Sequence, residues 1–452
     1  MLFTTNFLTQ VFPNTKGVVN DSLPIKEVTT DSRKKGDKSL FIPLKGENFD
    51  GHDFIKDAFN NGAVATIWER NKELPAFLPT DFPVYYVEDS LQALQALAHE
   101  YRKVVNPIVI GVTGSNGKTT TKDLIGTVMQ TTYKTFRTKG NFNNHIGLPL
   151  TILSMEADTE VLVLEMGMNH FGEIELLSNI AKPDYAVITN IGESHIEYLG
   201  SRQGIAQAKL EIMAGLKKGG LLFIDGDEPL LDNLHDKENI KTIGFKDGND
   251  HVIKDFDMTV SSSLFTLNDT PFRLQMLGKH NVKNASMAIE IAIRLQVPIE
   301  KIKRSLVNLE LTGMRFEIIQ GINGVTIIND AYNASPTSMK ASIEIVKQMQ
   351  SYQRKVLILG DMFEMGEHSK RLHRTVAEAI TDEVDYVFTI GQDSKEITDE
   401  LAKQQLQVHG QHFTSKEALV NEIQAFLDKG TVILLKASRG MKFESLIEQL
   451  VD

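Results

Sequence analysis

The fold of this chain is decided by one stretch, Ile108-Val109-Ile110-Gly111-Val112-Thr113-Gly114-Ser115-Asn116-Gly117-Lys118-Thr119-Thr120-Thr121. A run of β-branched residues enters it, a glycine turn follows, and the pattern of residues 123–130 predicts a helix. This order of strand, loop and helix is typical of a phosphate-binding loop. The glycines let backbone N–H groups point at a polyphosphate, and a helix start adds positive potential there. We expect Lys118 to contact the outer phosphates and the Thr119 hydroxyl to hold Mg²⁺.

The match departs from the strict G-x-x-x-x-G-K-[ST] pattern. Val112 stands five residues before Gly117, and the leading glycine, Gly111, comes one place early. The pattern is better written T-G-x-x-G-K-T. An ordinary glycine turn between a strand and a helix is the alternative, but turn chemistry does not explain Gly-Lys-Thr-Thr directly after a β-run.

Composition indicates a globular protein with several domains. The chain has 452 residues, 41% hydrophobic and 24% charged, which predicts two to four domains. Its formal net charge of −11 argues against a general nucleic-acid or anionic-membrane binder. It has no cysteine, no signal-peptide pattern and no apolar run long enough to span a membrane. We therefore expect a cytoplasmic protein with no membrane insertion and no nucleic-acid partner.

The hydrophobic pattern divides the chain into three α/β segments. Residues 1–105 contain short strands, at 39–44 and 63–67, and a helix at 91–105. In residues 106–312 strands and helices alternate, and an antiparallel hairpin is expected at 257–277. Residues 313–452 alternate again and predict a Rossmann-like, doubly wound domain. Buried strands are expected at 161–165, 186–190, 221–225, 325–328, 355–359, 386–390 and 431–435, and a helix at 282–295. The fold class is thus α/β, with a mostly parallel central sheet.

Several polar residues follow predicted strands of the central segment. Glu165 ends an apolar strand in the sheet of the phosphate loop, where a carboxylate suits Mg²⁺; a capping or salt-bridged glutamate is the alternative. His195 also follows a strand, but taken alone it is best interpreted as a loop histidine. Lys209 lies on a predicted helix, and alone it is a solvated lysine, although a buried lysine can lose its proton and become reactive.

The third segment carries its own candidates. Asp330 follows a strand and could contact a ribose or a metal, whereas Ser335 before Pro336 is typical of a helix N-cap. Two further loops, 360–366 and 436–440, come at strand ends of the same sheet. The second contains Lys436 and Arg439, which suit an anionic group, and a solvated loop is the alternative.

These residues, in this order, resemble the Mur ligase family of bacterial cell-wall synthesis, and the resemblance covers essentially the whole chain. It implies that Glu165 and His195 bind Mg²⁺, and that Lys209 is carbamylated with CO₂ and helps to hold a second Mg²⁺. The segment 278–284 resembles the family's G-x-x-N-x-x-N motif, whose last Asn reaches adenine. The implied ATP-binding residues are Thr113, Gly114, Ser115, Asn116, Gly117, Lys118, Thr119, Thr120, Asn284, Arg315 and Asp330. The implied catalytic residues are Lys118, Glu165, His195, Lys209 and Arg315, and the metal-binding ones are Thr119, Glu165, His195 and Lys209.

Three segments, 165–174, 329–339 and 359–366, resemble the family member that adds D-alanyl-D-alanine. The D-x-P-R segment typical of the member that adds the preceding diamino acid is not found. Segments 30–33 and 50–54 resemble the UDP-sugar-binding segments that these two ligases share, and segment 138–144 resembles one that faces the UDP-muramoyl peptide. Ser194 stands where the family commonly has Ala, and we expect little from that change. The implied substrate-binding residues are Ser32, Arg33, Asp50, Gly51, His52, Asn141, Asn143, Asn144, Tyr332, Asn333, Ser335, Lys436, Ser438 and Arg439.

The resemblance implies a two-step reaction. The terminal carboxylate of UDP-N-acetylmuramoyl-tripeptide attacks the γ-phosphate of ATP, giving an acyl phosphate and ADP. The amine of D-Ala-D-Ala then attacks the acyl carbon, and phosphate leaves. We expect two Mg²⁺ ions, a monomer, and closure of the third domain onto the central one before chemistry. The alternatives are the diamino-acid ligase of the same family, a folylpolyglutamate synthase-like ligase, a non-catalytic nucleotide-binding module, and another P-loop enzyme such as a kinase.

Overall fold

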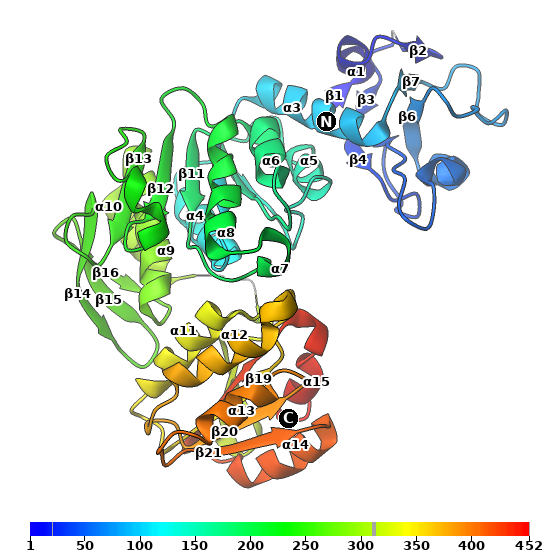
Figure 1. Cartoon of the computed structure of the whole chain (residues 1–452). Coiled ribbons are helices and arrows are strands. Elements are labelled where there is room, and N and C mark those ends of the chain that lie inside the picture. The colour runs from blue at the N-terminus through cyan, green and yellow to red at the C-terminus, as the bar shows by residue number, and fades with distance from the viewer. Residues whose placement is uncertain (20, 310–312, 452) are drawn as a thin grey trace.

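The computed structural model describes residues 1–19, 21–309 and 313–451. It has three main sheets, which follow one another along the chain and each carry helices (Figure 1). This confirms the predicted α/β class. The predicted domain boundary between residues 312 and 313 falls at 310–312, which lie outside the described residues. None of the helices in the described ranges is both long enough and apolar enough to cross a membrane.

The first part of the chain is a small sheet with the order β2-β7-β6-β5-β4. Its elements are β1 (Phe3–Thr4), α1 (Thr5–Val11), β2 (Thr15–Lys16), β3 (Pro24–Ile25), β4 (Glu27–Thr29), β5 (Ser39–Phe41), the 3-10 turn η1 (Gly51–Phe54), α2 (Ile55–Asn60), β6 (Ala63–Glu69), β7 (Val84–Val87) and α3 (Ser90–Val105). The predicted helix at 91–105 is α3. Asp89 caps its start by accepting a hydrogen bond from the Gln92 N–H, and Asn106 ends it in a left-handed conformation.

The central part holds a nine-stranded sheet with the order β16-β15-β14-β13-β12-β11-β8-β10-β9. Its elements are β8 (Ile108–Thr113), α4 (Lys118–Met129), β9 (Thr135–Arg137), α5 (Gly147–Ile152), β10 (Val161–Glu165), α6 (Glu173–Ala181), β11 (Tyr185–Ile188), α7 (Ile196–Leu199), α8 (Arg202–Leu210), η2 (Glu211–Gly215), β12 (Leu221–Asp225), η3 (Pro229–Leu234), β13 (Ile240–Gly244), β14 (His251–Met258), β15 (Ser263–Leu267), β16 (Thr270–Leu274), α9 (Lys279–Arg294) and α10 (Ile299–Val307). The seven strands from β8 to β14 run parallel to one another. Strand β15 pairs antiparallel with β14 and with β16.

Helices cover both faces of this sheet, which explains its continuous apolar strands. In β10, Val161 and Val163 pack into the same core as α4 and α9, whereas Leu162 and Leu164 pack with α3, α5 and α6 on the other face. The predicted strands 161–165 and 221–225 have the observed bounds. The helix expected from residue 123 begins earlier, at Lys118, because Gly117 in a left-handed conformation starts it directly after the turn.

The third part is a six-stranded sheet with the order β17-β18-β22-β19-β20-β21, parallel except for β17. Its elements are β17 (Glu317–Gln320), η4 (Ile322–Gly324), β18 (Thr326–Asn329), α11 (Pro336–Lys347), β19 (Arg354–Gly360), η5 (Gly366–His368), α12 (Ser369–Val376), η6 (Ala377–Ala379), β20 (Tyr386–Ile390), α13 (Lys395–Leu401), β21 (His409–Phe413), α14 (Lys416–Ile423), η7 (Gln424–Phe426), β22 (Thr431–Lys436), η8 (Arg439–Met441) and α15 (Glu444–Ile447). Helices α11 and α12 lie on the side that faces the central part (Figure 1).

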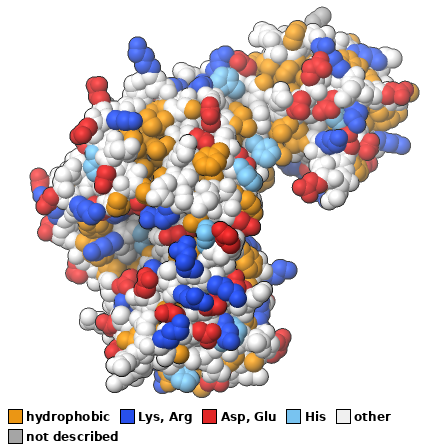
Figure 2. Space-filling view, in the orientation of Figure 1, with side chains coloured by type: hydrophobic (Ala, Val, Ile, Leu, Met, Phe, Trp, Pro, Cys, Tyr) orange, Lys and Arg blue, Asp and Glu red, His pale blue; other side chains and the backbone are white. Residues whose placement is uncertain are grey.

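The first part projects to one side of the central part, and the third part lies below it (Figures 1 and 2). Helix α3 connects the first two parts and packs on α5 and α6. In the space-filling view an open space separates the first part from the third. A substrate that contacts both parts must therefore extend across the central part.

Candidate active site

The phosphate loop lies where the strand order of the central sheet changes direction. The strand before it, β8, sits between β10 and β11, so that the chain continues to β9 and β10 on one side and to β11 on the other. The carboxyl ends of parallel strands leave a crevice at such a point. Residues 113–120, which the sequence predicted for ATP, run from the last residue of β8 through the turn into the start of α4.

Hydrogen bonds from the segment after β11 hold the loop open. The backbone N–H groups of Ser115 and Asn116 donate to the carbonyl and the side-chain oxygen of Asn190, at 3.1 and 2.9 Å. The Thr189 hydroxyl donates to the Asn116 carbonyl at 2.5 Å. Gly114 has a φ of +152°, and a Cβ there would lie 1.8 Å from the Thr189 hydroxyl oxygen. The glycine is thus required by close backbone approach.

Lys118 turns back onto its own loop. Its Nζ donates to the Gly114 carbonyl at 2.8 Å. Burial lowers the pKa of Lys118, and the nearby Glu165 carboxylate opposes that shift. The ammonium thus lies at the place where the loop would receive phosphate oxygens.

Glu165 closes the other side of the loop. Its Oε2 accepts a hydrogen bond from the Thr119 hydroxyl at 2.8 Å, and its Oε1 accepts one from Asn143 Nδ2 at 2.8 Å. The glutamate and the threonine are both buried. One hydroxyl and one carboxylate fit Mg²⁺, which takes few protein ligands and completes its shell with waters and phosphates. No group of three or more His, Cys, Asp or Glu residues within the described ranges could hold a metal by itself.

His195 and Lys209 lie beside this centre. Nδ1 of His195 is 2.6 Å from Oε2 of Glu364, a residue of the third part of the chain. Lys209 is only 1% exposed on α8. Burial, and secondly the positive charge of Lys118, hold the pKa of Lys209 well below its ordinary value. Burial thus favours the neutral amine of Lys209, which is the form of lysine that reacts with CO₂.

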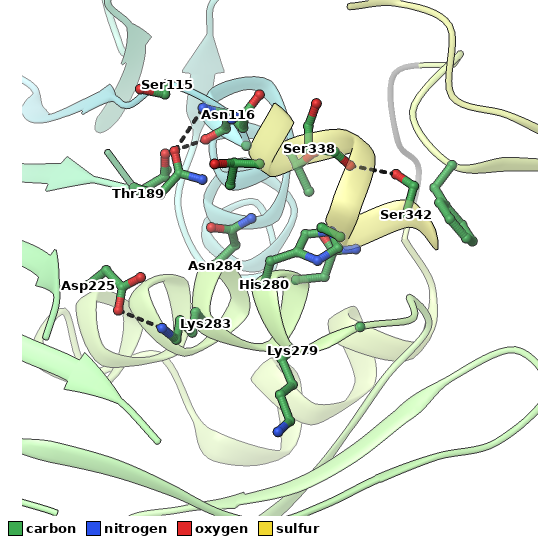
Figure 3. A pocket seen from close by; sticks show the side chains of 18 of the residues that line it. Ser115, Asn116, Thr189, Asp225, Lys279, His280, Lys283, Asn284, Ser338 and Ser342 are labelled. Carbon is green, nitrogen blue, oxygen red and sulfur yellow. Dashed lines mark hydrogen bonds and ion pairs between the residues drawn. The ribbon is translucent and has the colours of Figure 1, made fainter. Parts of the chain in front are cut away.

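Helix α9 forms the floor of the crevice. Asn284 lies so close to the turn that a Cβ on Gly117 would be 2.8 Å from its Nδ2. The preceding residue, Lys283, pairs with Asp225 at 2.7 Å and with Asp227 at 2.8 Å. Figure 3 shows Asn284 between this ion pair and the contact of Asn116 with Thr189. The predicted adenine contact is therefore adjacent to the phosphate loop.

The third part of the chain supplies the opposite wall. The Arg315 guanidinium lies 4.1 Å from the centre of the Tyr332 ring. Lys436 Nζ pairs with Asp330 at 2.5 Å, and the Ser342 hydroxyl donates to the same carboxylate at 2.6 Å. These cations face the crevice from a domain that contains no part of the phosphate loop.

Two hydrogen bonds join this wall to the central part. The Ser335 hydroxyl caps α11, as predicted, and donates to Asn116 Oδ1 at 3.2 Å. Glu193 accepts from the backbone N–H and the hydroxyl of Thr337, at 3.1 and 2.7 Å. The start of α11 thus docks directly beside the phosphate loop.

Between these walls lies a cavity of about 900 Å³. It gathers most of the predicted ATP residues and several of the predicted substrate residues: Ser115, Asn116, Gly117, Lys118, Thr119, Thr120, Asn143, Glu165, Asn284, Arg315, Asp330, Tyr332, Asn333 and Lys436. Lining residues that the sequence did not predict include Arg202, Asp225, Asp227, Glu228, Phe245, Phe256, His280, Lys283 and Ser342. Of these, only His280 and Lys283 had a signal in the sequence, because they lie inside the 278–284 motif.

Other predicted residues do not line this cavity. They are Thr113, Gly114, Asn141, Asn144, His195, Lys209, Ser335, Ser438 and Arg439, together with the residues predicted in the first part. Ser438 and Arg439 lie in the loop after β22, where the Ser438 hydroxyl accepts from the Phe363 N–H at 2.8 Å. Asn144 caps the start of α5 by accepting from the Gly147 N–H, and Asn141 is exposed nearby.

The residues predicted in the first part form a separate group. Asp50 accepts from His52 and from Lys72, at 2.6 and 2.7 Å, and Arg33 pairs with Asp31 at 2.9 Å. Gly51 starts η1, and Ser32 is buried. These residues are distant in the fold from the phosphate loop (Figure 1).

The fold and the cavity together define a class of protein. A triphosphate would lie in a phosphate loop of one domain, under cations contributed by another. This is the arrangement of an enzyme that uses a nucleoside triphosphate to activate a second substrate held between domains.

Comparison with known families narrows this class. Three family models match successive parts of the chain: the Mur ligase family catalytic domain at residues 24–102, the Mur ligase middle domain at 112–292, and the Mur ligase glutamate ligase domain at 314–439.

Individual relatives match over nearly the whole length. The UDP-N-acetylmuramoyl-tripeptide--D-alanyl-D-alanine ligase of Bacillus subtilis is 47% identical over 95% of this chain and 93% of its own. A crystal structure of MurF from Acinetobacter baumannii superposes with a TM-score of 0.86 at 29% identity, covering 99% of this chain and 98% of that one. MurF from Thermotoga maritima in complex with ADP gives a TM-score of 0.81 at 30% identity, covering 94% and 96%. The chain belongs to the Mur ligase family and is an ATP-dependent ligase.

Proposed function

We propose that this chain joins D-alanyl-D-alanine to the terminal carboxylate of UDP-N-acetylmuramoyl-tripeptide, using ATP and releasing ADP and phosphate, in the synthesis of peptidoglycan precursors. The observation that carries this proposal is the cavity in which the phosphate loop and Glu165 face Arg315 and Lys436 from the third part of the chain. The near full-length match to relatives that bear this enzyme's name supports the choice of substrates.

The charges of the cavity suit the first step. A substrate carboxylate and a triphosphate repel each other at short range, and the repulsion is strong where water is excluded. Lys118, Arg315 and Lys436 are cations that reduce it. A carboxylate oxygen then attacks the γ-phosphorus, the bond to the β-phosphate oxygen breaks, and ADP leaves an acyl phosphate behind.

The second step forms the amide. The lone pair of the dipeptide's amine attacks the acyl carbon, the bond from that carbon to the phosphate oxygen breaks, and inorganic phosphate leaves with the electron pair. The ammonium group of the dipeptide loses one proton before this attack, and the nitrogen loses a second proton to the solvent as the amide forms. Holding both reactants in one cavity supplies most of what this step needs, because the acyl phosphate is already activated.

The proposed metal sites use the residues around Glu165. Thr119 and Glu165 would hold one Mg²⁺, and His195 with a carbamate on Lys209 would hold a second. Bound Mg²⁺ neutralises the phosphate charge that develops during transfer. Burial of Lys209 and its lowered pKa support the carbamate, since a neutral amine is needed to form it.

The remaining residues are assigned to the substrates. We propose that Ser32, Arg33, Asp50, Gly51 and His52 bind the UDP end, because they lie in a separate part of the chain that a long substrate can reach across the central part. Asn141, Asn143 and Asn144 would face the peptide. The residues that would contact the substrates from the third part of the chain are Tyr332, Asn333, Ser335, Lys436, Ser438 and Arg439.

We also propose the organisation of the molecule. The domains would be residues 1–105, 106–312 and 313–452, each built on one sheet. One chain supplies the whole cavity, so a monomer would suffice. ATP and a nucleotide-activated precursor place the reaction in the cytoplasm.

Phosphate release from ATP tests the proposal. Release that requires both UDP-N-acetylmuramoyl-tripeptide and D-Ala-D-Ala, with an amide product of the matching mass, would support it. Release with the dipeptide precursor and a free diamino acid would instead assign the preceding step. Release with folate and glutamate would assign a folylpolyglutamate synthase, and either result would overturn the proposal.

A further inference from the structure

Glu364 reaches from the third part of the chain to the proposed reaction centre. Its carboxylate Oε2 lies 2.6 Å from Nδ1 of His195. Both residues have left-handed backbones, with φ of +61° for Glu364 and +66° for His195. Such conformations are unfavourable for residues with side chains, and they concentrate where function requires them. Two of them meet here across a domain junction.

The Glu364 carboxylate is accessible from the solvent. The side chain keeps 42% of its surface exposed, whereas that of His195 keeps 17%. Glu364 is therefore an anion with an open face, and a cation arriving from the solvent can reach it.

Three other carboxylates at this junction already have firm partners. Glu165 accepts from Thr119 and Asn143, and Glu193 accepts twice from Thr337. Asp330 is paired with Lys436. Glu364 differs from them because only its Oε2 contacts His195, which leaves its Oε1 without a partner among the described residues. That oxygen can accept from another group while the contact with His195 stays in place.

The loop of Glu364 is joined to the loop of Arg439. The Phe363 N–H donates to the Ser438 hydroxyl at 2.8 Å, and the Ser438 N–H donates to the Asp361 carbonyl at 3.0 Å. Glu364 comes one residue after this contact. Arg439 does so too, but its guanidinium is paired with Glu444.

We propose that Glu364 binds the amino group of the incoming dipeptide, and so holds its nitrogen toward the acyl carbon. The inference rests on the proposed function. A carboxylate attracts an ammonium group and accepts its N–H hydrogens, whereas it repels the phosphates and carboxylates of the other substrates. The side chain is thus suited to the one cationic group among the reactants.

The test compares the dipeptide with an analogue that lacks the amine. Propionyl-D-alanine has the same chain as D-Ala-D-Ala without the amino group, and it serves as a competitive inhibitor that cannot react. In Glu364→Gln we expect the KM for D-Ala-D-Ala to rise by about tenfold or more, as the loss of a charge-assisted hydrogen bond predicts. The Ki of propionyl-D-alanine and the KM for ATP should stay within about twofold.

Two further variants separate this role from a structural one. Glu364→Asp keeps the charge, so its KM for D-Ala-D-Ala should lie between those of the wild type and Glu364→Gln. Glu193→Gln alters a different carboxylate at the junction. It should leave the ratio of the KM for the dipeptide to the Ki of the analogue unchanged. A Glu364→Gln protein in which dipeptide and analogue weaken equally, or in which the Mg²⁺ requirement rises instead, would overturn the inference. So would a Glu193→Gln protein with the same selective loss.

The proposed function fails in a different way. A wild-type protein that releases no phosphate with the tripeptide precursor and D-Ala-D-Ala would overturn that function and this inference together. A wild-type protein that is active with them, beside a Glu364→Gln variant with an unchanged ratio, would overturn the inference alone.

Discussion

Lys209 illustrates how the surroundings of a single residue decide its chemistry. In the sequence it is one lysine on a polar helix, and nothing in its spacing distinguishes it from a solvated side chain. In the fold it is buried, and its pKa is held well below the ordinary value by burial and by Lys118. A carbamate there would place an anion near the positive charge of Lys118, which favours its formation.

The prediction for Lys209 is a carbamate that can be seen directly. Wild-type protein equilibrated with ¹³C-bicarbonate at pH 8 should show one protected carbamate resonance by NMR. Lys209→Met, which keeps an unbranched side chain of similar length, should lack that resonance and lose nearly all phosphate-releasing activity. A resonance that persists in Lys209→Met would assign the carbamate to another lysine and contradict the prediction.

Tyr332 is predicted to position Arg315 for ATP. The guanidinium lies over the ring at 4.1 Å, and the buried Nε of Arg315 has no hydrogen-bond partner among the described residues. A cation–π contact of this kind contributes about 0.5–2 kcal/mol. Tyr332→Leu should therefore raise the KM for ATP by roughly 2- to 30-fold.

The ring of Tyr332, and not its hydroxyl, should be responsible for the change in the KM for ATP. Tyr332→Phe keeps the ring and is expected to have a KM for ATP close to that of the wild type in the same steady-state assay. If Tyr332→Phe and Tyr332→Leu were equally impaired, the contact with Arg315 would not explain the effect.

Residues of the site were predictable where neighbours in sequence are neighbours in space. The loop from Thr113 to Thr120 is continuous, so its pattern identified a strand, a turn and a helix start together. The contact between His195 and Glu364 joins residues from two domains, and no local pattern encodes it. The same holds for Asp225 and Asp227, which line the cavity only because β12 ends beside β8's loop.

At the scale of elements, a single polar residue between strands can connect several elements of the cavity wall, and no sequence pattern indicates this. Asp227 follows β12 and accepts from the backbone N–H groups of Phe245 and Lys246, at 2.8 and 3.0 Å. It also pairs with Lys283. One carboxylate thus ties β12, the end of β13 and helix α9 together.

A pH-dependent stability follows from Asp227. Burial alone would raise its pKa, but the hydrogen bonds from Lys283, Phe245 and Lys246 lower it from 3.8 to about 2. Because the folded value lies below the unfolded one, the stabilisation is complete above about pH 4 and is lost as the pH falls toward 2. Asp227→Asn should lower the free energy of unfolding by about 2 kcal/mol at pH 7.

Urea denaturation followed by circular dichroism measures this effect. The difference between wild type and Asp227→Asn should be the same at pH 7 and pH 5 and should shrink below pH 4. Asp269→Asn, at an exposed turn of the same domain, is the control and should show no such difference. A difference that grows on acidification would have the wrong sign for a lowered pKa.

Elements were predicted well where they are long and apolar. Strands β10, β12 and β20 matched because each residue of such a strand is covered by helices on one face or the other. Strands β9, β17 and β21 were missed, since they lie at sheet edges where one flank needs no apolar residue. In β21 the sequence is His409-Gly410-Gln411-His412-Phe413, whose strand state depends on pairing with β20.

At the scale of the whole molecule, the predicted parts of the site are not all in one place. The cavity lies between the central and third parts, whereas the residues predicted to bind the UDP end lie in the first part (Figures 1 and 2). The sequence indicated three α/β segments but not their placement, because the contacts between them join residues that are far apart in the sequence. Asn116 with Ser335 and Glu193 with Thr337 are examples.

Such a junction predicts movement when the substrates bind. Hydrogen bonds between a few polar side chains contribute little net free energy, so bound ATP and precursor can add contacts that outweigh them.

A compact chain of 452 residues has a radius of gyration of about 22 Å. Small-angle scattering should show a larger value for the free protein and a decrease toward about 22 Å when a non-hydrolysable ATP analogue and UDP-N-acetylmuramoyl-tripeptide are both present. Lys118→Met, which removes the cation of the phosphate loop, should contract much less at the same ligand concentrations. Equal radii with and without both ligands would show that the domains do not close, and the third part would then have to deliver Arg315 and Glu364 from the positions they already hold.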